Sequence, residues 1–125
     1  MKARYGLGLA LLAGVAIGAG LVGSLHAQGK HAYVVIGIRS INDADSFKTA
    51  LQKVPAVIAS AGGHYVVRTD KIISLDGKPP QRFALIGFDS VEKAQAWYNS
   101  PEQKELTAVR IKATDSLAFI VEGAD

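Results

Sequence analysis

Two residues suited to acid–base chemistry and anion binding, His64 and Arg68, lie four positions apart. On a strand, His64 and Arg68 would point to the same face, so the two side chains could share one wall of a pocket. Histidine titrates near neutral pH, and a nearby arginine favours its neutral form, which suits a general base. A half-buried histidine bonded to one backbone group is the alternative interpretation. His64 is therefore a candidate catalytic residue.

A second arginine extends this set. Arg68 ends one predicted strand and Arg82 begins the next, which places both at the rim of a sheet. A guanidinium presents forked donors that match a planar oxyanion, so the pair predicts a clamp for a carboxylate or another anion. A salt bridge to a nearby carboxylate, or simple solvation, would explain the same two residues without a ligand.

Two adjacent aromatic residues on a predicted helix complete the candidates. Trp97 and Tyr98 point about 100° apart, so one can pack in the core while the other faces a pocket. The hydroxyl of Tyr98 makes it the second candidate catalytic residue. Arg110 either reaches the same rim or lies on the surface. The expected ligand-binding residues are thus Arg68, Arg82, Trp97 and Arg110.

Composition excludes several other kinds of site. The chain has no cysteine, and its other histidines, His26 and His31, lie near the N-terminus, so no metal-ligand set is expected. No glycine-rich phosphate loop or serine nucleophile motif occurs, so no cofactor is expected. Without Lys2 and Arg4 of the N-terminal segment, twelve basic residues face eleven acidic ones, a net charge of +1. Binding to nucleic acid through a basic surface therefore has little support.

The elements that must position these residues follow from apolar patterns. A β-branched run precedes the helix-capping pair Asn42–Asp43. An apolar helical stripe then begins at Phe47, and Pro55 within it predicts a kink. The helix is predicted to end at Gly62–Gly63. Further helices are predicted after Ser90 and after Ser100. Strands are predicted at residues 32–39, 64–68, 82–88 and 117–121.

This order predicts an α+β fold of the ferredoxin-like βαββαβ type. Its four-stranded antiparallel sheet would carry the helices on one face. The other face is partly apolar and is expected to pair with a second copy of the chain. A domain of this size often gains stability as an oligomer.

The sequence resembles a known family over most of this domain. Its signature is carried by the residue runs Ala32-Tyr33-Val34-Val35, Gly62-Gly63-x-Tyr65-x-Val67-Arg68, Ala96-Trp97-Tyr98-x-Ser100-Pro101-Glu102 and Val121-Glu122-Gly123. These are similar in order and spacing to the domain of unknown function 1330 family. The resemblance implies a dimeric α+β barrel with a pocket between sheet and helices. It does not imply any particular reaction. His64, Phe47, Ala50 and Gln103 depart from the family pattern, as do Gly37, Gly87 and Thr69-Asp70.

The N-terminal segment is expected to direct export. Two basic residues precede an uncharged run at residues 6–25 and a region rich in small residues, which is the order of a signal peptide. Cleavage after Ala27 or Gly29 would fit, and an uncleaved membrane anchor is the alternative. We therefore expect a signal peptide or anchor at residues 1–27, a short flexible start at 28–31 and the domain at 32–123. The domain would be periplasmic or secreted, or tethered to a membrane outside the cytoplasm.

Two functions remain open from the sequence. The first is a homodimer whose small-molecule pocket serves ligand binding or cofactor-independent catalysis on a small anionic or carbonyl compound. The alternative is a non-enzymatic envelope module that acts through its dimer surface or a membrane tether, which the departures from the family pattern favour. Whether the chain is an enzyme is not decided by these residues.

Overall fold

The computed structural model describes residues 30–124, so the predicted signal peptide or anchor lies outside the described residues. The strands are β1 (Ala32–Ile41), β2 (His64–Thr69), β3 (Arg82–Phe88) and β4 (Thr114–Glu122). The helices are α2 (Ala44–Ser60), α3 (Val91–Tyr98) and α4 (Pro101–Ala113). Among the helices of residues 30–124, none has the length and apolar character needed to span a membrane.

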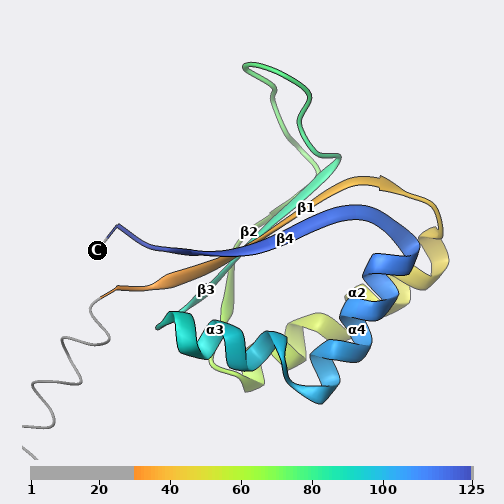
Figure 1. The fold of residues 1–125 in the computed structure, drawn as a ribbon. Coiled ribbons are helices and arrows are strands. Elements are labelled where there is room, and N and C mark those ends of the chain that lie inside the picture. Colours follow the sequence, from red (N-terminus) through yellow and green to blue (C-terminus); the bar gives the residue numbers. More distant parts are fainter. Residues whose placement is uncertain (1–29, 125) are drawn as a thin grey trace, which may run out of the picture.

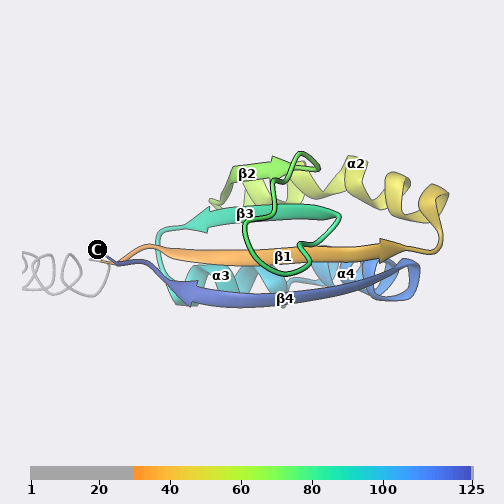
Figure 2. The same ribbon diagram turned by 90° about the horizontal axis from the view of Figure 1, so that it is seen from above.

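The strands form one antiparallel sheet in the order β2-β3-β1-β4. Figure 1 shows all three helices on one side of this sheet, and Figure 2 shows the four strands side by side in front of the helices. The prediction of an α+β, ferredoxin-like βαββαβ fold is thus confirmed. One face of the sheet is covered by helices, and we call the other the open face.

Helix α2 begins and ends at the residues that the sequence indicated. The Asp43 carboxylate accepts hydrogen bonds from the Ser46 amide at 3.1 Å and the Ser46 hydroxyl at 2.8 Å, and these bonds lower the pKa of Asp43. The helix continues through Pro55 to Ser60. Gly62 follows with a φ of 84°, a left-handed conformation that glycine adopts without strain.

The core lies between the sheet and the helices. Its largest buried side chains include Phe88 of β3 and Trp97 of α3, which are 2% and 1% exposed and whose ring centroids lie 5.4 Å apart. The Phe88 ring also lies against Gly63, where an added Cβ would come within 2.5 Å of the Phe88 Cε1 atom. The glycine pair after α2 therefore both ends the helix and leaves room for the Phe88 ring.

The open face is apolar. On β4, Leu117, Phe119 and Val121 are 38%, 46% and 38% exposed and alternate with inward-facing residues such as Ile120. Phe119 lies opposite Val35 of β1, which in turn lies opposite Leu85 of β3. This stripe of apolar side chains crosses the central strands, as the sequence predicted.

The connection between β2 and β3 stands on the same side of the sheet as the open face. Figure 1 shows residues 70–81 as a loop that rises away from the helices. Its Ile73 and Leu75 side chains are 88% and 97% exposed. At the base of the loop, Pro80 lies over Gly37 of β1, 3.6 Å from the position of an added Cβ. The loop therefore extends the apolar surface of the open face outward.

Candidate functional site

A cavity of about 60 Å³ lies between the sheet and the helices. Its walls are mostly apolar and come from β1, β3, α2 and α4. They include Ile36, Phe47, Val54, Ile86 and Leu106. The polar lining residues are Tyr65, Arg68, Arg82, Gln103 and Arg110. Such a cavity suits a small molecule with an apolar body and few polar groups.

Two of the lining arginines come from adjacent strands. Arg68 of β2 pairs with Ala84 of β3, and its guanidinium Cζ lies 4.6 Å from the centre of the Tyr65 ring, a cation–π contact. Arg68 is exposed, which places it at the mouth of the cavity, whereas Arg82 at the start of β3 is half-buried. The structure therefore brings together the two arginines that the sequence indicated as an anion clamp.

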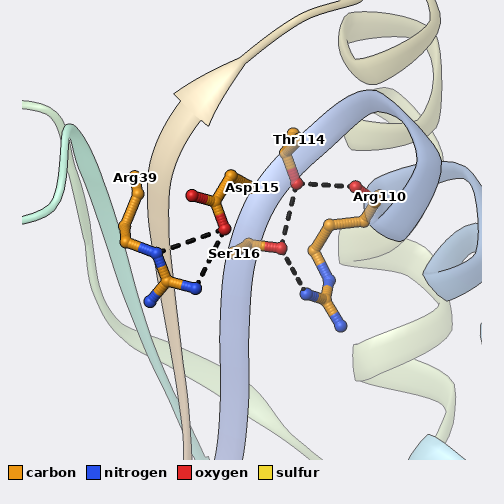
Figure 3. Close-up of polar contacts among 5 residues, drawn as sticks. All are labelled: Arg39, Arg110, Thr114, Asp115 and Ser116. Atoms are coloured by element: carbon orange, nitrogen blue, oxygen red, sulfur yellow. Dashed lines mark hydrogen bonds and ion pairs between the residues drawn. The ribbon is translucent and has the colours of Figure 1, made fainter.

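Arg110 joins them from α4. Its Nη1 donates to the Ser116 hydroxyl at 2.7 Å, and its Nη2 donates to the Tyr98 hydroxyl at 3.0 Å. Figure 3 shows the Arg110 guanidinium beside Ser116, whose hydroxyl lies 2.9 Å from that of Thr114. Tyr98 is not among the cavity-lining residues. Its hydroxyl thus orients Arg110 and does not reach the cavity itself.

Among residues 30–124, no carboxylate neutralises the charges of these three arginines. Within residues 30–124, neither Arg68 nor Arg82 nor Arg110 forms an ion pair, and no acidic side chain lines the cavity. Arg39 contrasts with them, because its Nη2 lies 2.9 Å from Asp115 and its hydrogen bonds hold the pKa of that carboxyl below the usual value. The cavity therefore combines apolar walls with uncompensated positive charge.

His64 lies on the opposite face of the sheet from Arg68. The β2–β3 register shifts between Tyr65 and Val67, so one extra residue separates the two side chains. A bulge of this kind moves all later side chains of the strand to the other face. The His64 ring accordingly lies over Gly87 on the open face, with Cε1 3.0 Å from the position of an added Cβ. The expected shared wall between His64 and Arg68 does not form, and Tyr65 accompanies Arg68 instead.

Trp97 and Gln103 supply the buried polar atoms next to the cavity. Trp97 is 1% and Gln103 is 4% exposed, and both line the cavity. Gln103 Nε2 donates to the Thr107 hydroxyl at 3.1 Å. In the part of the chain that the structure describes, the Trp97 Nε1 and Gln103 Oε1 atoms have no hydrogen-bond partner. Gln103 was not among the candidate residues predicted from the sequence, although its spacing to Leu106 and Arg110 places all three on one face of α4.

Residues 31–124 match the family model described as Domain of unknown function (DUF1330). The chain belongs to this family. No curated protein matches the sequence.

Solved structures share the fold of this DUF1330 domain at low sequence identity. A protein of unknown function from Rhodopseudomonas palustris is 14% identical with a TM-score of 0.63, the match covering 77% of this chain and 84% of that one. SnoaB, a cofactor-independent oxygenase from Streptomyces nogalater, is 11% identical with a TM-score of 0.54, covering 77% and 95%. A dimeric ferredoxin-like protein of unknown function from Thermobifida fusca is 18% identical with a TM-score of 0.53, covering 74% and 90%. These likenesses show the fold alone.

The lining of the DUF1330 cavity contains few titratable side chains. Its titratable side chains are one tyrosine and three arginines, and neither a carboxylate nor an imidazole is among the described lining residues. Guanidinium groups remain protonated at all ordinary pH values, so they hold anions and do not abstract protons. No group of three His, Asp or Glu side chains within residues 30–124 could hold a metal ion.

Proposed function

We propose that this DUF1330 domain binds a small carboxylate with an apolar body in the cavity between its sheet and helices. The observation that carries the proposal is that Arg68, Arg82 and Arg110 all line one apolar cavity and have no carboxylate partner among the described residues. A buried or half-buried guanidinium is stabilised by an anion, and a carboxylate matches its forked donors. The ligand would supply the missing negative charge.

The size of the cavity limits the ligand. A volume of about 60 Å³ holds about four to six water-sized groups, because one such group needs about 10–15 Å³. The exposed Arg68 at the mouth allows the carboxylate to lie at the entrance, with the carbon chain inside. Short aliphatic acids of about four to six carbon and oxygen atoms fit this description. Binding is the role that we favour over catalysis, since no histidine or carboxylate is among the lining residues that the structure describes.

Replacing Arg82 by glutamine is expected to weaken the binding of a short acid such as butyrate about 10- to 100-fold. The variant loses a charge-assisted hydrogen bond and leaves the ligand's charge less compensated. Trp97 is the sole tryptophan of the chain and lines the cavity, so its fluorescence reports a titration directly. Arg39→Gln is the matched control, because Arg39 pairs with Asp115 and does not line the cavity. Equal butyrate affinity in the Arg82 and Arg39 variants would contradict the clamp.

A second copy of the chain is proposed to cover the open face. Three features support this pairing: the apolar stripe through Phe119, the exposed Ile73 and Leu75 on the loop of the same side, and the description of the Thermobifida fusca protein as dimeric. Pairing of two identical faces gives a closed, symmetric dimer. His64 would lie within that interface, because its ring rests on the open face.

The domain is further proposed to act outside the cytoplasm. The order of basic, apolar and small residues in the first 27 positions supports a signal peptide. The intact mass of the protein from the envelope fraction of an expressing bacterium tests this proposal. We expect a chain that begins at Gln28 or Lys30. A membrane-bound chain that retains residues 1–27 would instead support the tether.

A further inference from the structure

We infer that the ligand carries a hydroxyl group, and that Gln103 and Trp97 bind this group inside the cavity. The inference rests on the proposed binding of a carboxylate and adds the second polar group of the ligand. It identifies the ligand class as small hydroxycarboxylic acids.

The first observation is an unpartnered acceptor. Gln103 is 4% exposed and lines the cavity, yet its Oε1 accepts no hydrogen bond within residues 30–124. Its Nε2 donates to the Thr107 hydroxyl, which leaves the amide oxygen as the atom without a partner among the described residues. A buried amide oxygen without a donor is costly, and such groups are rare in folded proteins. A ligand that donates a hydrogen bond would remove this cost.

The second observation is an unpartnered donor on the same lining. Trp97 is 1% exposed, and its Nε1–H donates to no acceptor in the described part of the chain. Buried indole N–H groups usually find a partner. A hydroxyl group offers the acceptor that the Trp97 Nε1–H lacks and the donor that the Gln103 Oε1 lacks. A methyl group would satisfy neither, and a ketone oxygen would leave Gln103 Oε1 unpaired.

These two residues and the arginines together define the ligand. The arginines favour a carboxylate, the apolar walls favour a carbon chain, and the Gln103–Trp97 pair favours a hydroxyl group. The volume of about 60 Å³ restricts the enclosed part to about four to six atoms. Hydroxybutyrates have this size and chemistry and are suitable probes.

The experiment compares four acids on the full mature protein by titration of the Trp97 fluorescence: butyrate, β-hydroxybutyrate, γ-hydroxybutyrate and acetoacetate. We expect at least one hydroxybutyrate to bind about tenfold or more tightly than both butyrate and acetoacetate, since only the hydroxyl group pairs with both side chains. If butyrate or acetoacetate binds as tightly as both hydroxybutyrates, the hydroxyl site is wrong while the carboxylate site stands. If none of the four acids binds, the proposed function itself fails, and this inference with it.

A Gln103→Leu variant separates a direct contact from a structural role. We expect the preference for the hydroxybutyrate over butyrate to disappear, while the butyrate affinity changes less than about threefold, because leucine keeps most of the side-chain volume and removes the acceptor together with the Nε2 bond to Thr107. A general loss of affinity for both acids would overturn the direct contact. Gln103→Met serves the same purpose if the leucine variant does not fold, because methionine is unbranched like glutamine. The comparison of acids on the unaltered protein decides the inference in any case.

Discussion

A Phe119→Asp variant is expected to be a monomer at concentrations where the unaltered chain is a dimer. Phe119 is 46% exposed on β4 and lies opposite Val35, near the middle of the apolar stripe on the open face. A symmetric interface would bury the new carboxylate twice, once from each copy. An unpaired buried charge costs about 3–5 kcal/mol, so the new carboxylate of each copy weakens association by a factor of about 10² to 4 × 10³.

Sedimentation or light scattering at micromolar concentration measures the outcome. The matched control is Ile111→Asp, which introduces the same charge at an aliphatic residue that is 63% exposed on α4, in the helical layer and away from the open face. This control is expected to remain a dimer. A monomeric unaltered chain, or a Phe119→Asp dimer of undiminished affinity, would show that the open face does not pair. Circular dichroism of both variants establishes that the monomer is folded.

The sequence predicted the fold because its apolar periodicity changes clearly between strands and helices. The capping residue Asp43 and the glycine pair at 62–63 set the ends of α2, and the structure agrees. The last strand is longer than predicted. It begins at Thr114 because the polar residues Thr114 and Asp115 still pair with the end of β1, and such pairing depends on the neighbouring strand, which an apolar pattern does not record.

The candidate site was only partly predictable. Arg68 and Arg82 line the same cavity, as expected from their positions at the facing ends of two adjacent strands that the apolar pattern delimits. His64 was assigned to the wrong face because the bulge between Tyr65 and Val67 leaves no mark in the residue types. Gln103 was missed because a glutamine on a helix is usually exposed, and its burial arises only when α4 packs over the sheet.

Replacing Phe88 by alanine is expected to lower the free energy of unfolding by about 3–5 kcal/mol. Phe88 is 2% exposed, packs at 5.4 Å from the Trp97 ring and fills the space above Gly63. A small domain has a total stability of about 5–15 kcal/mol, so this loss is a large part of it. Phe88→Leu keeps most of the side-chain volume and is expected to cost about 1 kcal/mol. Equal costs for both variants would show that the Phe88 ring is not closely packed.

The comparison of Phe88→Ala with Phe88→Leu is most informative when both variants also carry Phe119→Asp. In a dimer, the free energy of unfolding depends on protein concentration, because association stabilises the folded state. A core variant can then change the apparent stability through the interface as well as through its own cavity. Phe88 is a β3 residue that faces the helices, whereas Phe119 is a β4 residue that faces away from them, so the two sites share no packing layer. Denaturant unfolding of the two Phe88 variants in this monomeric form therefore reports the loss of core packing alone. An equal loss of unfolding free energy in the dimer would show that core and interface act independently.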